Sequence, residues 1–384
     1  MDDSLQISLI TCSPGHDTYA MFGHTAIRVN DVQHNSDLVF NYGMFNYQSE
    51  NFIYRFVKGE TDYILGAEPA SFFFGRYSER GVTVTEQVLN LTAEEKQSLA
   101  QALAINAEPQ NRTYRYNWLY DNCTTRARDV IERAIDGKVE YEATATADVP
   151  CVGADMSATV LTTREILHKY TAVSDWTRFG IDVVLGEEID RPLDHFQQMF
   201  IPENFMNAAD HAVITDASGQ QRPLVASSYH PIDLAEPKHI DNTHSSLMCM
   251  TGLLFVSVGL AFFELRRHKT FKWFDASLAF VLGLVGCLVA FLFFFSEHAG
   301  VDTNYLVILL NPLHFAAIPF ILRRKTKVLS CVILADILLL ALTLILAGQV
   351  INTAILPLAF TLLVRVLVNL QIFSYLCRRI TKQN

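Results

Sequence analysis

Cys123 stands at the predicted start of a helix, a position where a thiol can act as a nucleophile. Asp121 and Asn122, directly ahead of it, are typical N-cap residues. Apolar residues follow at helical spacing: Ala127, Val130, Ile131, Ala134 and Ile135. Unpaired N–H groups and the helix dipole lower the pKa of a thiol in the first turn and favour the thiolate. Such a thiolate can attack a carbonyl carbon. The alternative is an ordinary buried cysteine on the apolar helix face.

A nucleophilic cysteine needs a base, and the base needs a polar group that orients it. His24 lies in a stretch where apolar and polar residues alternate as in a strand. Asn41 lies in the predicted partner strand, residues 38–43, where it would stand beside His24. The order His, Asn, Cys resembles that of circularly permuted papain-like enzymes. We therefore expect Cys123, His24 and Asn41 to be catalytic. The alternatives are a structural role for His24 and another orienting group, such as His34.

Four further residues are candidates for substrate binding: Arg28, Tyr42, Asn122 and His298. Arg28 shares a strand face with His24, where it either binds an anionic group or pairs with one of the many acidic side chains. His298 lies among polar residues at the outer edge of a predicted membrane region. Those polar residues either face the lipid headgroups or form a solvated loop.

Metal-dependent and serine-dependent chemistry have weaker support in the sequence. His16, Asp17, His24 and His34 lie close together, but no HExxH motif or paired CxxC motif is present. The sequence also lacks a GxSxG motif and a glycine-rich phosphate-binding loop. We therefore expect neither a metal nor another cofactor.

The composition changes sharply near Ser245. The net charge is −17 up to His244 and +7 from Ser245 onward. The first part reads as an acidic globular domain with its own core, for which nucleic acid is an unsuitable partner. The second part reads as embedded in a lipid bilayer. We expect a catalytic domain at 1–215, a linker at 216–244 and a transmembrane domain at 245–384.

Five apolar stretches are long enough to cross a bilayer: 246–265, 276–295, 305–322, 328–346 and 353–376. Eleven of the twelve basic residues after Ser245 lie in three clusters, around 266–272, 323–327 and 378–382. The positive-inside rule places these clusters in the cytoplasm. The N-terminal domain is then outside the membrane, and the C-terminus is cytoplasmic.

An external domain requires export, yet the first residues show neither a basic region nor an apolar core of a signal peptide. We therefore infer that a signal peptide has been removed. In an oxidising compartment Cys12 and Cys151 either form a disulfide or remain free. Within the predicted spans, Asp336 and Arg365 are expected to pair with each other, because an isolated charge there is costly. The pair would either join the fourth and fifth spans or line a polar cavity.

Local patterns also predict elements of the first domain. Strands are expected at 5–12, 23–29, 38–43, 63–65 and 82–84. A helix is expected from Leu91 to about Asn106, because Thr92 and Glu95 form a capping-box pattern at its start.

Several segments together resemble the Bacteroidetes-type lipoprotein N-acyltransferases (Lnb), and the likeness covers most of the chain. The segments that carry it are 9–15, 22–29, 40–43, 121–129 and 176–186. The most specific are GHTAIRV, from Gly23, and DNCTTR, from Asp121. That family resembles, more distantly, NlpC-type amidases and lecithin:retinol acyltransferase. The resemblance implies an α+β permuted papain-like extracytoplasmic domain followed by about five transmembrane helices.

The resemblance also implies a reaction and a location. A fatty acyl chain would move from a membrane phospholipid, through a thioester on Cys123, to the α-amine of a diacylglyceryl-cysteine at a lipoprotein N-terminus. Backbone N–H groups at the start of the Cys123 helix would stabilise the oxyanion. The protein would lie in the bacterial inner membrane with its N-terminal domain in the periplasm. The alternatives are a membrane-anchored thiol amidase that acts on cell-wall peptide and a non-enzymatic lipid or lipoprotein receptor.

Overall fold

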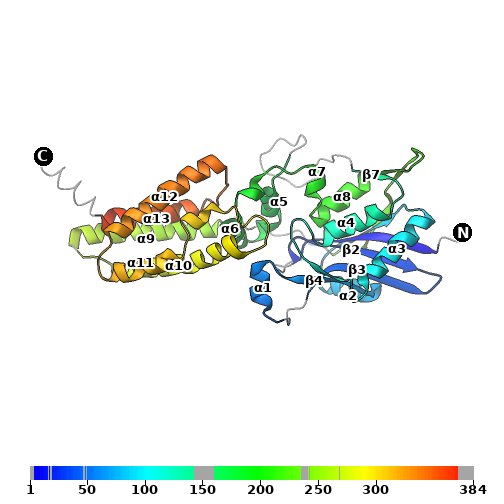
Figure 1. The fold of residues 1–384 in the computed structure, drawn as a ribbon, viewed down its shortest axis with the longest axis horizontal. Coiled ribbons are helices and arrows are strands. Elements are labelled where there is room, and N and C mark those ends of the chain that lie inside the picture. Colours follow the sequence, from blue (N-terminus) through cyan, green and yellow to red (C-terminus); the bar gives the residue numbers. More distant parts are fainter. Residues whose placement is uncertain are drawn as a thin grey trace. The chain divides into compact units, whose positions relative to one another are not determined.

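The computed structural model describes residues 4–141 except 16, 18, 19, 46, 47 and 49, then 160–234, then 241–370 except 242 and 268. The chain divides into two compact units (Figure 1). The first unit comprises Met1–Ile166 and Pro192–Lys238, and the second comprises Leu167–Arg191 and His239–Asn384. The boundary predicted near residue 215 is therefore wrong for residues 167–191, which belong to the second unit.

The first unit is built on an antiparallel sheet with the strand order β10-β5-β1-β2-β3-β4-β6. Its strands are β1 (Leu5–Cys12), β2 (His24–Asp31), β3 (Ser36–Met44), β4 (Asp62–Pro69), β5 (Val84–Leu89), β6 (Thr113–Arg115) and β10 (Val225–Ile232). A small second sheet joins β7 (Lys138–Glu140), β8 (Val213–Thr215) and β9 (Gln221–Pro223). Four of the five strands expected from the sequence are present, whereas the strand expected at 82–84 overlaps β5 only at Val84.

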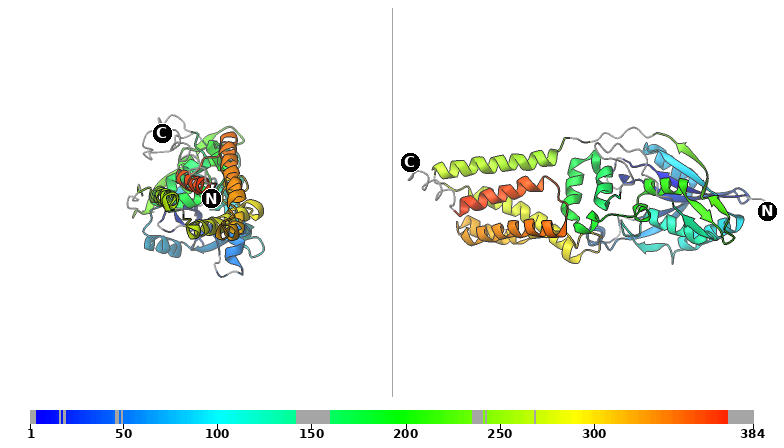
Figure 2. Two further views of the ribbon diagram at one scale, coloured as in Figure 1. Left: turned by 90° about the vertical axis from the view of Figure 1, so that its left-hand side faces the viewer. Right: turned by 90° about the horizontal axis from the view of Figure 1, so that it is seen from above.

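Helices cover both faces of the large sheet (Figures 1 and 2). One face packs against α2 (Ala70–Glu79), and the other packs against α3 (Ala93–Ala107), α4 (Cys123–Ala134) and α8 (Pro202–His211). The remaining helices near this unit are α1 (Phe52–Lys58), α5 (Thr163–Tyr170) and α7 (His195–Gln198). The predicted capping box of α3 is confirmed, because Thr92 and Glu95 bond each other's backbone N–H groups.

The alternation predicted for β2 is confirmed by its packing. Ile27 is buried in the core beneath α3, α4 and α8, whereas Ala26 is buried in the core beneath α2. Successive side chains of a strand point to opposite faces, so His24 and Arg28 share the α2 face with Ala26. The hairpin of β2 and β3 is also confirmed, with Ile27 opposite Phe40.

Residues 221–232 correct the predicted linker. They form β9 and β10, and β10 pairs with β5 as the last strand of the large sheet. Six of the eight residues of β10 are exposed, so this edge strand shows none of the apolar alternation that would identify it in a sequence. Its polar composition and Pro231 are compatible with an edge position, where one hydrogen-bonding side of the strand has no partner strand.

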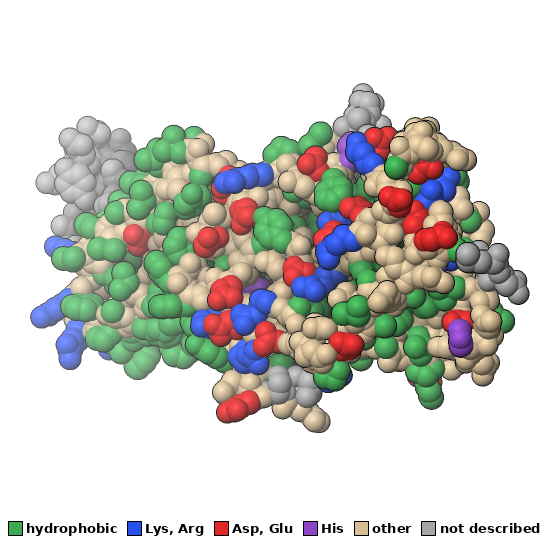
Figure 3. Space-filling model, turned by 45° about the vertical axis from the view of Figure 1, so that its right-hand side comes forward, with side chains coloured by type: hydrophobic (Ala, Val, Ile, Leu, Met, Phe, Trp, Pro, Cys, Tyr) green, Lys and Arg blue, Asp and Glu red, His purple; other side chains and the backbone are tan. Residues whose placement is uncertain are grey.

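The second unit is helical and apolar. Its long elements are α9 (Ser245–Arg267), α10 (Lys272–Phe295), α11 (Leu313–Leu322), α12 (Lys327–Ala347) and α13 (Ile355–Asn369). Among the described residues, four helical stretches are long and apolar enough to cross a membrane, the third being Tyr305–Leu322. Figure 3 shows apolar side chains over much of this surface. The fifth predicted span corresponds to α13, and its predicted end at residue 376 lies outside the described residues.

Residues 167–191 pack against the ends of these helices within the second unit. They form η2 (Thr171–Val173), α6 (Asp175–Val184) and η3 (Glu187–Asp190). The Gly186 N–H donates to the Gly300 carbonyl at 2.6 Å, and Asn352 donates to the Asp182 carboxylate at 2.9 Å. The loops that include Gly300 and Asn352 therefore lie at the same end of the helices.

The predicted pairing of Asp336 with Arg365 is wrong. Arg365 is buried and donates to Asp275 at 2.5 Å and to Glu264 at 3.0 Å. Glu264 is on α9 and Asp275 is on α10, and both carboxylates lie close to the loop that joins these helices. The guanidinium therefore ties three helices together, a long-range arrangement that sequence spacing does not indicate.

Candidate active site

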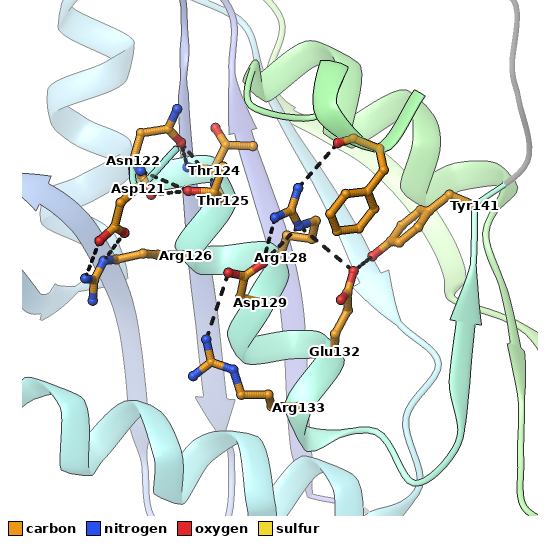
Figure 4. Close-up of polar contacts among 11 residues, drawn as sticks. Asp121, Asn122, Thr124, Thr125, Arg126, Arg128, Asp129, Glu132, Arg133 and Tyr141 are labelled. Carbon is orange, nitrogen blue, oxygen red and sulfur yellow. Dashed lines mark hydrogen bonds and ion pairs between the residues drawn. The ribbon is translucent and has the colours of Figure 1, made fainter. Parts of the chain in front are cut away.

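Cys123 is the first residue of α4, as predicted. Asn122 is the N-cap, and its side-chain oxygen accepts hydrogen bonds from the N–H groups of Thr124 at 2.8 Å and Thr125 at 3.0 Å (Figure 4). Beyond the first turn, the apolar residues predicted to form the buried face are buried. The N-cap and this apolar face together fix the position of Cys123 beside strands β2 and β3.

His24 and Asn41 lie side by side, as the predicted hairpin requires. His24 Nε2 is 2.6 Å from Asn41 Oδ1, and Asn41 is buried. The His24 ring is also close enough to the Cys123 side chain for each group to affect the charge state of the other. Because Nε2 faces the Asn41 oxygen, Nδ1 is the ring nitrogen left for the thiol. The ring of Tyr77, from α2, stacks nearly parallel to His24 with the centroids 6.4 Å apart.

The electrostatic environment favours a charged thiolate and a charged imidazole. Burial alone raises the pKa of the Cys123 thiol, but His24 and the N–H of Thr25 outweigh burial and lower the pKa to about 7. Burial likewise lowers the pKa of His24, but Cys123 and Asn41 outweigh it, so the pKa is raised. Each group thus stabilises the charged form of the other, and the two titrate as a pair.

A cavity of about 550 Å³ lies beside this group. His24, Asn41 and Gly43 line it together with Tyr77. Its volume falls within the range of about 300–1,000 Å³ that is typical of small-molecule sites. Cys123 does not line the cavity directly, but its Cβ would lie 3.6 Å from a Cβ placed on Gly43. The absence of a side chain at Gly43 therefore brings the cavity close to the thiol.

One expectation about the helix start needs correction. The N–H groups of the first turn were expected to stabilise an oxyanion together. The side chain of Asn122 already accepts hydrogen bonds from Thr124 and Thr125. Two of these donors are therefore occupied, and the N–H of Cys123 itself has no hydrogen-bond partner among the described residues.

The four residues proposed to bind substrate have different surroundings. Arg28 donates to Asp37 at 2.8 Å and to Glu86 at 2.9 Å. Of the two alternatives, the structure therefore favours pairing with acidic side chains. Tyr42 is buried on the sheet face that α3, α4 and α8 cover, where its hydroxyl accepts a hydrogen bond from Asn106 at 3.1 Å.

Asn122 is buried and is held by the carbonyls of Trp118 and Phe200, at 2.9 Å each. With its side-chain oxygen on the first turn, it acts as the helix cap. His298 belongs to the second unit, where its backbone N–H donates to Ser296 Oγ at 3.3 Å. Within the first unit the structure thus gathers the three predicted catalytic residues, whereas Arg28 and Tyr42 are bound to other partners and Asn122 serves as the cap next to Cys123.

Three cavity residues on α2 and its C-cap were not predicted from the sequence: Arg76, Tyr77 and Arg80. Arg76 is held by Glu68, and the Arg80 guanidinium lies 5.1 Å from the centroid of the Tyr77 ring. The only sequence signal was the four-residue spacing of Arg76 and Arg80, which is equally typical of a solvated helix face. Their proximity to His24 results from the packing of α2 on the sheet.

The remaining predicted groups are placed as follows. Cys12 is a free and fully buried thiol beside the cavity, and Cys151 lies outside the described residues. His34 is exposed and bonds Asp31 at 2.6 Å, so it does not orient His24. In the described part of the chain, no group of three or more metal-ligating side chains is present.

Comparison with known proteins identifies both halves of the chain. Residues 2–173 match the model of the Lnb N-terminal periplasmic domain. Residues 240–375 match the model of the Lnb transmembrane domain. Searches among curated proteins and among solved structures gave no significant match. The two matches together cover most of the chain, and they agree with the order of a domain of sheets and helices followed by apolar helices. The protein therefore belongs to the Lnb family, membrane proteins with a periplasmic N-terminal domain that are associated with lipoprotein acylation.

Proposed function

We propose that this protein is a lipoprotein N-acyltransferase that works through a thioester on Cys123. The acyl donor is a membrane phospholipid, and the acceptor is the α-amine of a diacylglyceryl-cysteine. The observation that carries the proposal is the arrangement of His24 between Asn41, at 2.6 Å, and a thiol whose pKa is lowered to about 7. This papain-like arrangement supplies a nucleophile, a base and an orienting amide without a cofactor.

In the first half-reaction the Cys123 thiolate attacks an ester carbonyl of the phospholipid. The S–C bond forms while the carbonyl electron pair moves to oxygen. Collapse of this intermediate breaks the ester C–O bond, and the protonated His24 gives its proton to the departing alkoxide. The products are an acyl thioester and a lysophospholipid.

In the second half-reaction the lipoprotein amine attacks the thioester. His24 is now neutral and accepts a proton from the incoming nitrogen. The C–S bond breaks and restores the Cys123 thiolate beside the imidazolium. Asn41 keeps the imidazole ring in one orientation through both halves, because its side-chain oxygen accepts a hydrogen bond from the Nε2–H of His24.

The charge of the cavity supports an anionic donor. Arg76 and Arg80 both line it, Arg76 being paired with Glu68, and Asp17 is the one carboxylate among the described lining residues. Every glycerophospholipid carries an anionic phosphate ester a few bonds away from its acyl esters. A guanidinium group is well suited to phosphate oxygens, so these arginines would attract the donor independently of its headgroup.

The membrane unit supports the proposed orientation in the inner membrane. The loops that contain Gly300 and Asn352 both bond residues 182–190, so both belong to one end of the helices. These loops lack Lys and Arg, whereas basic clusters begin near Arg266 and Arg323. By the positive-inside rule this end is periplasmic, and the C-terminus is cytoplasmic.

Intact-mass analysis of the full chain in detergent, after exposure to dioleoylphosphatidylethanolamine, tests the proposal. We expect the mass to increase by one oleoyl group, and hydroxylamine should remove that group. Cys123→Ala should abolish both this adduct and the acylation of a diacylated lipopeptide. Cys249→Ala is the matched control, because Cys249 is a free, exposed thiol on α9.

The same measurement separates the proposed activity from its rivals. If Cys123 carries no adduct, and if Cys123→Ala still acylates the lipopeptide, the thioester mechanism is wrong. If the wild-type chain binds phospholipid but acylates nothing, it is a receptor. Cleavage of a cell-wall peptide without any acyl adduct would identify a thiol amidase.

A further inference from the structure

One buried hydroxyl near Cys123 has no hydrogen-bond partner among the described residues. It belongs to Tyr114, on β6, whose side chain is only 8% exposed. Burying an unpaired hydroxyl costs about 1–3 kcal/mol, so most buried hydroxyls are paired. The neighbouring Gly43 N–H can only donate to the phenol oxygen, which leaves the phenol proton without an acceptor. An unpaired donor held in this position suggests a partner that is present only during the reaction.

The hydroxyl lies in the same small region as the catalytic groups. A Cβ placed on Gly43 would lie 3.6 Å from the Cys123 Cβ, 4.0 Å from the His24 Cε1 and 4.0 Å from the Tyr114 oxygen. These three groups therefore surround one point, and the absence of a side chain at Gly43 leaves that point open. A carbonyl under attack by Cys123 requires a hydrogen-bond donor close to its oxygen.

The surroundings of Tyr114 hold its ring in place. The Arg126 guanidinium lies 3.6 Å from the ring centroid, and it is fixed by Asp121 at 2.6 and 2.7 Å. On the sheet side, the Tyr42 ring meets it edge-on with the centroids 6.2 Å apart. A cation over the ring draws electron density from the phenol and makes its O–H a better donor. A donor that is already fixed needs no reorganisation during the reaction.

The phenol is also in the protonation state that a donor requires. Burial raises the pKa of Tyr114 well above its ordinary value, and the nearby Cys123 thiolate adds to that rise. The hydroxyl therefore keeps its proton at neutral pH. It is a neutral donor in a site where the other two groups are charged.

We propose that Tyr114 is a catalytic residue that donates a hydrogen bond to the oxyanion formed at Cys123. The inference rests on the proposed thioester chemistry. When the sulfur attacks the ester carbon, the carbonyl π electrons move to oxygen, and that oxygen accepts the Tyr114 O–H and the Cys123 N–H. On collapse the electron pair returns to form the carbonyl, and the alkoxide leaves with the proton of His24. Tyr114 keeps its own proton throughout, so the step is balanced.

The test is Tyr114→Phe, which removes only the oxygen. The removed hydroxyl is unpaired, so this variant should fold as stably as the wild-type chain. The matched control is Tyr63→Phe, because Tyr63 is a buried tyrosine directly opposite Tyr114 in the β4–β6 pair. Two reactions of Cys123 are compared in the full chain. Acylation by p-nitrophenyl butyrate passes through an oxyanion, whereas alkylation by iodoacetamide does not.

We expect Tyr114→Phe to slow acylation of Cys123 by about 100-fold, the usual effect of losing one oxyanion donor. Its alkylation rate, and the pH dependence of that rate, should match those of the wild type. Tyr63→Phe should be unchanged in both reactions. With dioleoylphosphatidylethanolamine as donor, the same loss should appear in the rate of thioester formation.

Different failures have different meanings. Equal acylation of Tyr114→Phe and the wild type by the activated ester overturns the role of Tyr114 and leaves the proposed function intact. Equal loss in alkylation and acylation also overturns it, because the hydroxyl would then act on the thiolate. If the wild type reacts with the activated ester but not with phospholipid, the proposed function fails while the Tyr114 result stands. If Cys123 is acylated by neither donor, both proposals are overturned.

Discussion

Each unit of this protein contains a group of buried polar side chains, and the two groups are completed in different ways. In the first unit His24 and Asn41 meet a cysteine beside a cavity of about 550 Å³. In the second unit Arg365 joins Glu264 and Asp275 beside a cavity of only about 40 Å³. The larger cavity can admit part of a substrate, whereas the smaller has room for about one water molecule.

The difference lies in what each group has left to bind. The guanidinium of Arg365 and its two carboxylates form ion pairs with one another, and they connect α9, α10 and α13. Replacing such a cluster by apolar residues is often neutral, whereas removing one member leaves a buried charge. The imidazole of His24 has a neutral amide on one side and a thiol on the other, so it can still gain or lose a proton. Buried polarity in the second unit thus serves the fold, and in the first unit it serves the proposed chemistry.

The largest expected effect comes from His24→Ala, which should reduce thioester formation by about 10³-fold. In the wild type Cys123 is a thiolate above about pH 7, so its alkylation rate should rise through that pH and fall as acid protonates the sulfur. Without the imidazole, burial dominates and the midpoint should move upward by about one unit or more. The rate of alkylation by iodoacetamide, followed from about pH 5 to about pH 10, measures this midpoint in the variant and in the wild type.

The control for that variant is His211→Ala, because His211 is exposed on α8 and bonds only the Asn207 carbonyl among the contacts described. An unchanged midpoint in His24→Ala would show that the helix start alone activates Cys123. The His24 group would then have no demonstrated effect on the thiol, and it would no longer differ from the Arg365 group in this respect.

A second expected effect is on stability. Arg365→Met should lower the free energy of unfolding by about 3–5 kcal/mol, because two buried carboxylates lose their cation. Combining it with Glu264→Gln and Asp275→Asn should restore most of the loss. Thermal unfolding in detergent measures both variants. The alkylation midpoint of Cys123 should stay near pH 7 in each, and a shift would mean that the Arg365 cluster also controls the catalytic group.

The smallest expected effect comes from Arg80→Gln, with Arg133→Gln as an exposed control on α4. Arg80 is itself exposed at the cavity, so the loss of its charge should slow acylation by a phospholipid by only about fivefold. Acylation by dioleoylglycerol, which lacks the phosphate, should not change. Equal slowing with both donors would remove phosphate attraction from the proposal.

Local pattern was sufficient for the elements that present the catalytic residues. The N-cap at Asn122 and the apolar spacing after it are properties of a single helix, so the start of α4 followed from the sequence. The alternation around His24 and the short loop to the next strand defined a hairpin in the same way. Residues that depend on one strand or one helix can be placed by periodicity alone.

Long-range packing was not accessible from such patterns. The edge strand β10 has too few buried residues to show a period, and β6, with Tyr114, is only three residues long. The segment 167–191 joins the second unit through hydrogen bonds to loops more than a hundred residues away in the chain. Arg365 likewise finds its partners on helices far away in sequence.

The sequence by itself determined the two classes of environment, the helix that begins at Cys123, the hairpin with His24 and Asn41, and the likeness to the Lnb family. Charge, hydropathy and periodicity are carried by neighbouring residues, so these features need no knowledge of the fold. Only the tertiary structure decided which polar groups are satisfied: the occupied N–H groups of the first turn, the paired Arg28 and the unpaired hydroxyl of Tyr114. Whether a buried group finds a partner depends on side chains from distant segments, and that arrangement appears only when the chain is packed.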